Sequence, residues 1–96
     1  MRKGPIYAML LTPALAVVTP CAAQVGDVKY CNQYAQAAVD QVRAARSKPN
    51  CAAQMTGARW SASIRVHFNY CMSNPIYDVQ NVQSARETYL RSCGAI

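Results

Sequence analysis

The chain has 96 residues and a formal net charge of +6, from ten Lys and Arg and four Asp and Glu. A chain of this length forms at most one small domain, in which apolar burial roughly cancels conformational entropy, so a further stabilising link is expected. The charge that remains after removal of the export signal predicted below, +4, is modest, and together with export it argues against nucleic acid as a partner.

The N-terminal 23 residues are predicted to be a cleavable export signal. Arg2 and Lys3 form a short positive region, an apolar run follows from 6 to 18, and small residues precede the expected cleavage after Ala23. The apolar run is too short and too interrupted to cross a bilayer as a helix, which requires about 20 apolar residues. The mature chain, residues 24–96, is therefore expected as one domain in the periplasm or outside the cell, without a transmembrane segment.

Removal of the signal changes the charge. Without Arg2 and Lys3 the ten Lys and Arg become eight, which against four Asp and Glu leaves a net charge of +4. Cys21 leaves with the signal. Attachment of a lipid to this cysteine is the alternative, and Pro20 directly before it disfavours that interpretation.

Four cysteines remain in the mature chain, an even number that indicates disulfides in an exported protein. They are Cys31, Cys51, Cys71 and Cys93. Their spacings of 20, 20 and 22 residues contain no CxxC pair, which disfavours the alternative of a metal site. No metal or other cofactor is therefore expected.

The sequence predicts an all-α fold, a small disulfide-linked three-helix bundle with helices over about 28–46, 57–72 and 75–93. Asp27 is a suitable N-cap for the first helix, and Pro49 ends that segment. One face of this helix is rich in alanine, so that a neighbouring helix can approach closely. The face consists of Cys31, Ala35, Ala38, Val42 and Ala45.

The second predicted helix follows a connection over 51–56 and contains the only Trp, His and Phe of the chain. At helical spacing its buried seam consists of Gly57, Trp60, Ile64, His67 and Cys71. Asn74 is expected to cap the third helix, Pro75 to occupy its first turn and Gly94 to end it. The predicted apolar face of the third helix consists of Val79, Val82, Ala85, Tyr89 and Cys93.

Helix direction predicts which cysteines pair. Three helices joined by short connections run up, down and up, which places Cys31 and Cys71 at one end of the bundle and Cys51 and Cys93 at the other. At 1.5 Å per residue these ends are roughly 20 to 25 Å apart. Because a disulfide requires Cα atoms within about 7 Å, this layout allows only Cys31 with Cys71 and Cys51 with Cys93.

His67 and Trp60 are the unusual residues of the second predicted helix. To act as a general base, a metal ligand or a pH sensor, His67 would need partner residues, but the four acids are scattered and the cysteines are assigned to disulfides. We therefore favour a structural His67, hydrogen-bonded to Tyr30, Tyr34 or a backbone carbonyl. Trp60 is expected to fill the core opposite the alanines of the first helix rather than to anchor a partner.

Five basic residues are expected to gather at the end of the bundle that Cys51 and Cys93 close. They are Arg43, Arg46, Lys48, Arg59 and Arg91. Cations near helix C-termini compensate the helix dipole, but Arg59, predicted at the start of a helix, is not explained in this way. An anionic envelope component, either a lipid with a phosphate-bearing headgroup or a polymer, is therefore the partner hypothesis.

The motifs of the mature chain resemble those of a group of small exported four-cysteine helical proteins of bacteria, whose function is unknown. Their pattern is YC, YA and AV, a cysteine, GxRW, HxxWC and RxxxLxxC. This chain matches it with YCNQYAQAAVDQV, Cys51, TGARW, HFNYC and SARETYLRSC. It departs at Tyr70, where a Trp is typical, and at Ala52, where a Gly often follows the cysteine. The resemblance implies export and a helical fold, and it implies no reaction.

The expected function is that of an exported structural or binding module of the cell envelope that contacts anionic components. No catalytic residues are predicted, so an enzyme is not expected. One alternative is a small enzyme or metal-responsive protein that uses His67, which would have to line a cleft within reach of a carboxylate. The other is a membrane-active cationic protein, which the lack of a strongly basic amphipathic face disfavours.

Overall fold

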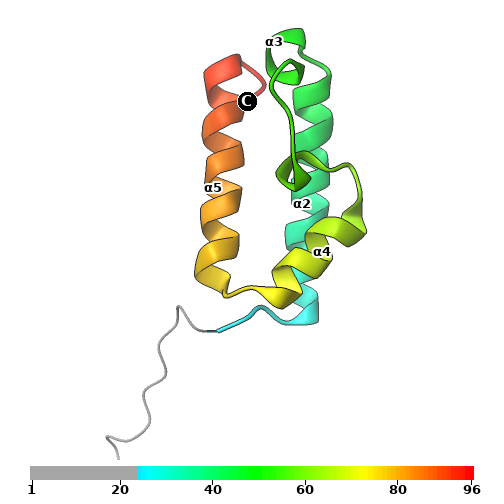
Figure 1. Cartoon of the computed structure of the whole chain (residues 1–96), viewed down its shortest axis with the longest axis vertical. Helices are drawn as coiled ribbons and strands as arrows, with labels where there is room; N and C mark the ends of the chain where they lie inside the picture. The colour runs from blue at the N-terminus through cyan, green and yellow to red at the C-terminus, as the bar shows by residue number, and fades with distance from the viewer. Residues whose placement is uncertain (1–23) are drawn as a thin grey trace, which may run out of the picture.

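The structure, a computed structural model, describes residues 24–96, and the predicted signal with Ala23 and Cys21 lies outside this range. The described chain is all-α, as predicted, with three main helices that run up, down and up (Figure 1). The elements are α2 (Val28–Arg46), α3 (Pro49–Ala52), the single 3₁₀ turn η4 (Ala58–Trp60), α4 (Ile64–Ser73) and α5 (Ile76–Cys93). No helix in residues 24–96 combines the length and the apolar character that a bilayer span requires.

Helix α2 has the predicted bounds. The Asp27 side chain accepts a hydrogen bond from the Tyr30 backbone N–H at 2.8 Å, which is the expected N-cap. Gly26, directly before Asp27, is packed against the first turn of α2. A Cβ atom added at Gly26 would lie 2.6 Å from the Tyr30 ring. Only glycine therefore allows the chain to approach the helix so closely.

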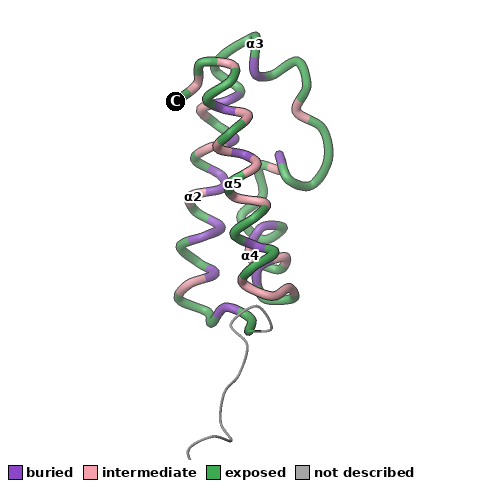
Figure 2. The backbone as a smooth tube through the Cα atoms, turned by 90° about the vertical axis from the view of Figure 1, so that its left-hand side faces the viewer, coloured by how far each residue is buried: buried purple, intermediate pink, exposed green. Residues whose placement is uncertain are grey.

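The buried face of α2, which alternates with exposed positions in Figure 2, consists of Cys31, Tyr34, Ala35, Ala38, Val39, Val42 and Ala45.

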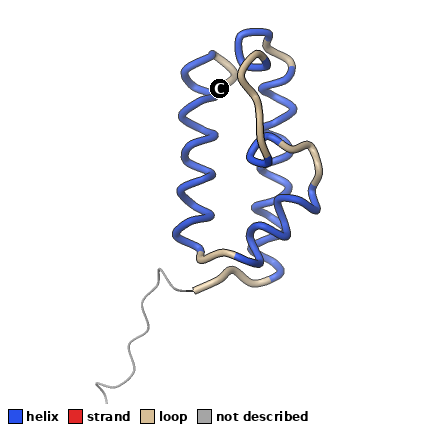
Figure 3. The backbone as a smooth tube through the Cα atoms, in the orientation of Figure 1, coloured by secondary structure: helices blue, strands red, loops and turns tan. Residues whose placement is uncertain are grey.

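The second predicted helix, 57–72, is wrong in its first half. Only α4 is an α-helix, and loop segments lie on both sides of η4 before it begins (Figure 3). Two serines explain the interruption. The Ser63 hydroxyl caps α4 by accepting from the Val66 N–H at 3.4 Å, and the Ser61 hydroxyl accepts from the Ser63 N–H at 3.0 Å. Serine side chains that bond nearby backbone groups compete with the helix in this way.

The other boundaries differ slightly from the prediction. Pro49 begins the short helix α3, where a connection was predicted, because proline fits the first turn of a helix. Helix α5 begins at Ile76, and Pro75 is its N-cap residue. The side chain of Asn74 donates to the Tyr70 carbonyl at 2.8 Å, so it caps the end of α4 and not the start of α5. Gly94, with a φ of 87°, ends α5 as predicted.

Two disulfides close the two ends of the bundle in the predicted pairing. The Cα atoms of Cys31 and Cys71 are 5.5 Å apart, and those of Cys51 and Cys93 are 5.3 Å apart. Each disulfide belongs to a separate apolar cluster. The first cluster contains Cys31, Tyr34, Cys71 and Val79, and the second contains Val42, Ala45, Cys51, Trp60 and Leu90. Disulfides of this kind are typical of proteins that fold in an oxidising compartment outside the cytoplasm.

Candidate functional site

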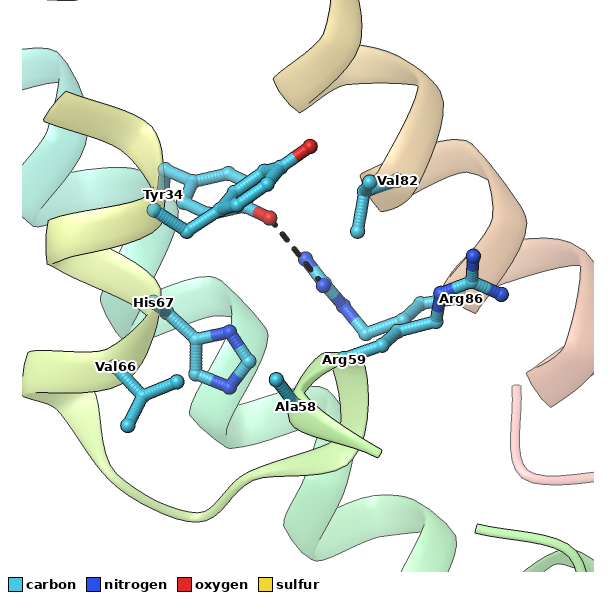
Figure 4. Close-up of a pocket in the computed structure, with 8 residues that line it drawn as sticks. Tyr34, Ala58, Arg59, Val66, His67, Val82 and Arg86 are labelled. Carbon is cyan, nitrogen blue, oxygen red and sulfur yellow. Dashed lines mark hydrogen bonds between the residues drawn. The ribbon is translucent and has the colours of Figure 1, made fainter. Parts of the chain in front are cut away.

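A cavity of about 190 Å³ lies between α2, η4, α4 and α5 (Figure 4). Its lining combines two arginines, one histidine and two tyrosines with three small apolar side chains. The lining residues are Tyr34, Ala58, Arg59, Val66, His67, Tyr70, Val82 and Arg86. None of these eight residues is acidic, so the cavity is a cationic and hydrogen-bonding environment.

Arg86 is the residue that distinguishes this cavity. Its side chain is fully buried and reaches from α5 toward Tyr34 on α2 (Figure 4). Its Nε donates to the Gln41 side-chain oxygen at 2.8 Å, and its Nη1 donates to the Tyr34 hydroxyl at 3.3 Å. The guanidinium carbon lies 5.2 Å from the centre of the Tyr34 ring, within the range of a cation–π interaction.

No carboxylate in residues 24–96 forms a salt bridge with Arg86. Gln41 and Tyr34, its two hydrogen-bond partners, are neutral groups. In residues 24–96 the Nη2 atom of Arg86 is buried without a hydrogen-bond partner. The salt bridge that the described chain contains joins Arg43 to Asp40 at 3.4 Å on the exposed surface. Because an uncompensated buried charge is costly, Arg86 is an unusual residue to keep inside so small a protein.

His67 lies on the opposite wall of the cavity and is 2% exposed. Its Nε2 lies 2.7 Å from the Ser61 carbonyl oxygen, which can only accept, so Nε2 carries the proton. This is the backbone partner expected of a structural histidine. Burial lowers the pKa of His67, the positive charge of Arg86 lowers it further, and the hydrogen bond to Ser61 opposes both effects. The imidazole is therefore neutral at pH 7, with Nδ1 as an acceptor.

Lowering the pH is expected to destabilise the fold through His67. In the unfolded chain its pKa returns to about 6.5, above the folded value. As the pH falls from 6.5 toward the folded-state pKa, the unfolded state binds a proton that the folded state does not, so the free energy of unfolding decreases in that window. Urea titrations at several pH values measure the slope. The variant His67→Gln should have a smaller slope, and an unchanged slope would contradict this assignment.

Tyr34 and Tyr70 supply hydroxyl groups to the cavity. The Tyr34 ring is buried and meets the His67 ring edge-on, with ring centres 6.5 Å apart. Burial raises the pKa of Tyr70, and the neighbouring Tyr34 and Asp78 raise it further. Tyr70 therefore keeps its proton at neutral pH, and both tyrosines line the cavity with a hydroxyl group that can donate a hydrogen bond.

Four of the five predicted basic residues lie at helix ends. Arg43 and Arg46 lie in the last turn of α2, and Arg91 lies in the last turn of α5. With Lys48, which precedes α3, they are exposed near the end that the Cys51–Cys93 disulfide closes. Arg59, predicted at the start of the second helix, lies instead in η4 and lines the cavity with His67 and Arg86.

Trp60 holds the segment that carries Arg59. Its indole is 7% exposed and packs in the cluster of Val42, Ala45 and Leu90. It meets the Tyr89 ring edge-on, with ring centres 5.1 Å apart. This is the core position that the alanine-rich face of the first helix led us to expect. By contrast Ile64, placed on the same predicted seam, is 44% exposed because η4 and α4 are not one continuous helix.

Sequence reasoning missed Arg86, although the sequence contained a signal. The predicted face of the third helix passed through Val79, Ala85 and Tyr89, whereas the fully buried residues of α5 are Val79, Arg86 and Leu90. These three are spaced by seven and four residues and share one helical face. An arginine at helical spacing between two core residues was therefore the available signal.

As a metal ligand or a catalytic base, His67 would need partner side chains, and residues 24–96 do not supply them. No group of three or more His, Cys, Asp or Glu side chains in residues 24–96 is arranged to hold a metal ion. The seven side chains that line the cavity with His67 include no carboxylate. In comparisons with known proteins, the chain matches no family model, no curated protein and no solved structure.

Proposed function

We propose that this protein is an exported binding module of the cell envelope, which receives an anionic group of an envelope component in the cavity between α2, α4 and α5. The observation that carries this proposal is Arg86, a fully buried cation at the cavity whose Nη2 atom has no partner among residues 24–96. An anion bound there would satisfy this donor and compensate the buried charge.

Two further features support the proposal. The N-terminal signal pattern, the resemblance to small exported proteins and the two disulfides agree with a periplasmic or extracellular location. The exposed cations Arg43, Arg46, Lys48 and Arg91 add a positive end to the bundle. Such a surface attracts an anionic partner at long range, whereas the cavity provides the specific contact.

The proposal predicts salt-sensitive binding to anionic surfaces. Co-sedimentation with vesicles containing phosphatidylglycerol, compared with vesicles of phosphatidylcholine alone, should show binding to the anionic vesicles only. A second series uses an immobilised anionic polysaccharide. Binding should weaken as the salt concentration rises, because ions screen the attraction. The absence of salt-sensitive binding in both series would contradict the proposal.

Two variants, each of which removes one positive charge, show where the anionic partner contacts the protein. Arg59→Gln removes a cation at the cavity, and Arg91→Gln removes one from the basic end. Both side chains are exposed, so neither change should disturb the fold. We expect Arg59→Gln to weaken binding more than Arg91→Gln. Equal effects would mean that charge alone determines binding and would contradict a role for the cavity.

A further inference from the structure

The proposed anion-binding function rests on the cavity, and on that basis we infer the chemical class of its ligand. We propose that the cavity binds a single carboxylate carried by a compact apolar body, with the carboxylate on Arg86 and Tyr34 and the apolar body against Val66 and Val82. Benzoate is a suitable probe of this class.

The charge of the cavity selects a single negative charge. Arg86 is the fully buried cation of the lining, and His67 is neutral at pH 7. Arg59 is exposed, so its charge is hydrated and needs no ligand to balance it, although it still attracts an anion. A carboxylate balances the one buried charge, whereas a phosphate dianion would bring a second negative charge into a partly desolvated site.

The donors of the cavity match the two oxygens of a carboxylate. The Nη2 atom of Arg86 has both hydrogens free of partners in residues 24–96. The Tyr34 hydroxyl accepts from Nη1 of Arg86, so its own proton remains available to donate. Because the acceptor is ionised and the donor is a guanidinium, this contact belongs to the stronger class of hydrogen bond.

The volume of the cavity and its apolar lining residues indicate the size and character of the ligand's apolar body. A cavity of about 150 Å³ lined by aliphatic and aromatic residues holds benzene, and this cavity has about 190 Å³. Ala58 and Val66 on one side of the cavity, and Val82 on the other, add apolar surface to the lining (Figure 4). A ring or branched chain of similar size would bury its surface between them, whereas acetate would leave this space unfilled.

Isothermal titration calorimetry of the mature protein, residues 24–96, tests this assignment with four probes. Benzoate should bind with a stoichiometry of one. Benzamide, which has nearly the same shape without the charge, should bind at least about tenfold more weakly, as loss of a charge-assisted hydrogen bond predicts. Acetate and inorganic phosphate should also bind more weakly than benzoate.

Variants then test the two donors. Arg86→Gln should abolish the binding of benzoate, whereas Arg65→Gln, which removes an exposed arginine outside the lining, should leave it unchanged. If Arg86→Gln does not fold, as judged by far-UV circular dichroism, Tyr34→Phe replaces it. This variant keeps the buried ring and removes one donor, so binding should weaken by a factor of about 2 to 10.

The outcomes separate the ligand class from the proposed function. Anionic vesicles bound without measurable binding of millimolar benzoate would overturn the carboxylate assignment and leave the function standing. Tighter binding of phosphate than of benzoate would have the same meaning. Unchanged binding of benzoate by folded Arg86→Gln or by Tyr34→Phe would also overturn the assignment. If neither vesicles, polysaccharide nor benzoate bind, both proposals fall.

Discussion

Replacement of Cys51 and Cys93 together by alanine is expected to lower the free energy of unfolding by about 4 kcal/mol, because a disulfide that closes a loop of this length restricts the unfolded chain. The two cysteines are 42 residues apart, and they tie α3 to the end of α5. Small domains have a total stability of only about 5 to 15 kcal/mol. We therefore expect the variant to be largely unfolded at temperatures that the wild-type protein tolerates.

The second disulfide is a matched comparison. Cys31 and Cys71 are 40 residues apart, so the loop-closure contribution is nearly the same for both bonds. Urea denaturation of the two double-alanine variants, each with one disulfide intact, should give similar losses of stability. An unchanged unfolding midpoint in either variant would contradict the contribution assigned to that disulfide. A large difference between the variants would show that native packing, and not loop closure, dominates.

Trypsin can separate all four cysteines, which allows the pairing itself to be measured. Cleavage after Lys and Arg, but not between Lys48 and Pro49, places the cysteines in four different peptides. These peptides are 30–43, 47–59, 66–86 and 92–96. Mass spectrometry without reduction should find 30–43 linked to 66–86, and 47–59 linked to 92–96. Any link between 30–43 and 47–59 would exclude the arrangement described above.

The change Trp60→Ala is expected to cost about 3 to 5 kcal/mol, the range observed when a large buried aromatic side chain is removed. Trp60 is the buried residue of η4, and it fills the space beside Ala45, Val42 and Leu90. The alanines of α2 are too small to close the resulting cavity. Loss of the indole should also release η4 from the core and displace Arg59 from the cavity that we propose as the anion-binding site.

The variant Trp60→Phe is the control, because it keeps an aromatic ring against Tyr89 and should lose less stability than Trp60→Ala. Far-UV circular dichroism is the suitable measurement, since both variants remove the only tryptophan of the chain. The displacement of Arg59 predicts weaker binding to anionic vesicles for Trp60→Ala under conditions in which it stays folded. If Trp60→Ala lost less stability than Trp60→Phe, the core role of the indole would be contradicted.

Local signals explain which parts of the fold could be predicted. Asp27 and Gly94 act within a few residues of their own positions, so the start of α2 and the end of α5 agreed with the prediction. The pairing of the cysteines followed from helix direction and helix length, which do not depend on side-chain detail. The signal that interrupts the predicted helix 57–72, the two serines Ser61 and Ser63, was also local. The prediction gave more weight to the helical spacing of the apolar residues in this region.

The candidate site depended on contacts between distant parts of the chain. Arg86 is held by Gln41 and Tyr34, which precede it by 45 and 52 residues. Helical periodicity by itself favours an arginine on the solvent side, because burial of its charge is costly. Only the packing of α5 against α2 shows that Gln41 and Tyr34 make this burial possible.

The amino-acid sequence was therefore sufficient for the helical class, the disulfide pairing and the core position of Trp60, because short-range spacing and chain direction determine them. The cavity required the folded chain. Arg59, His67 and Arg86 belong to three different elements, and no spacing relates them in the sequence. Their convergence on one cavity without a carboxylate results from how η4, α4 and α5 pack on the alanine-rich face of α2.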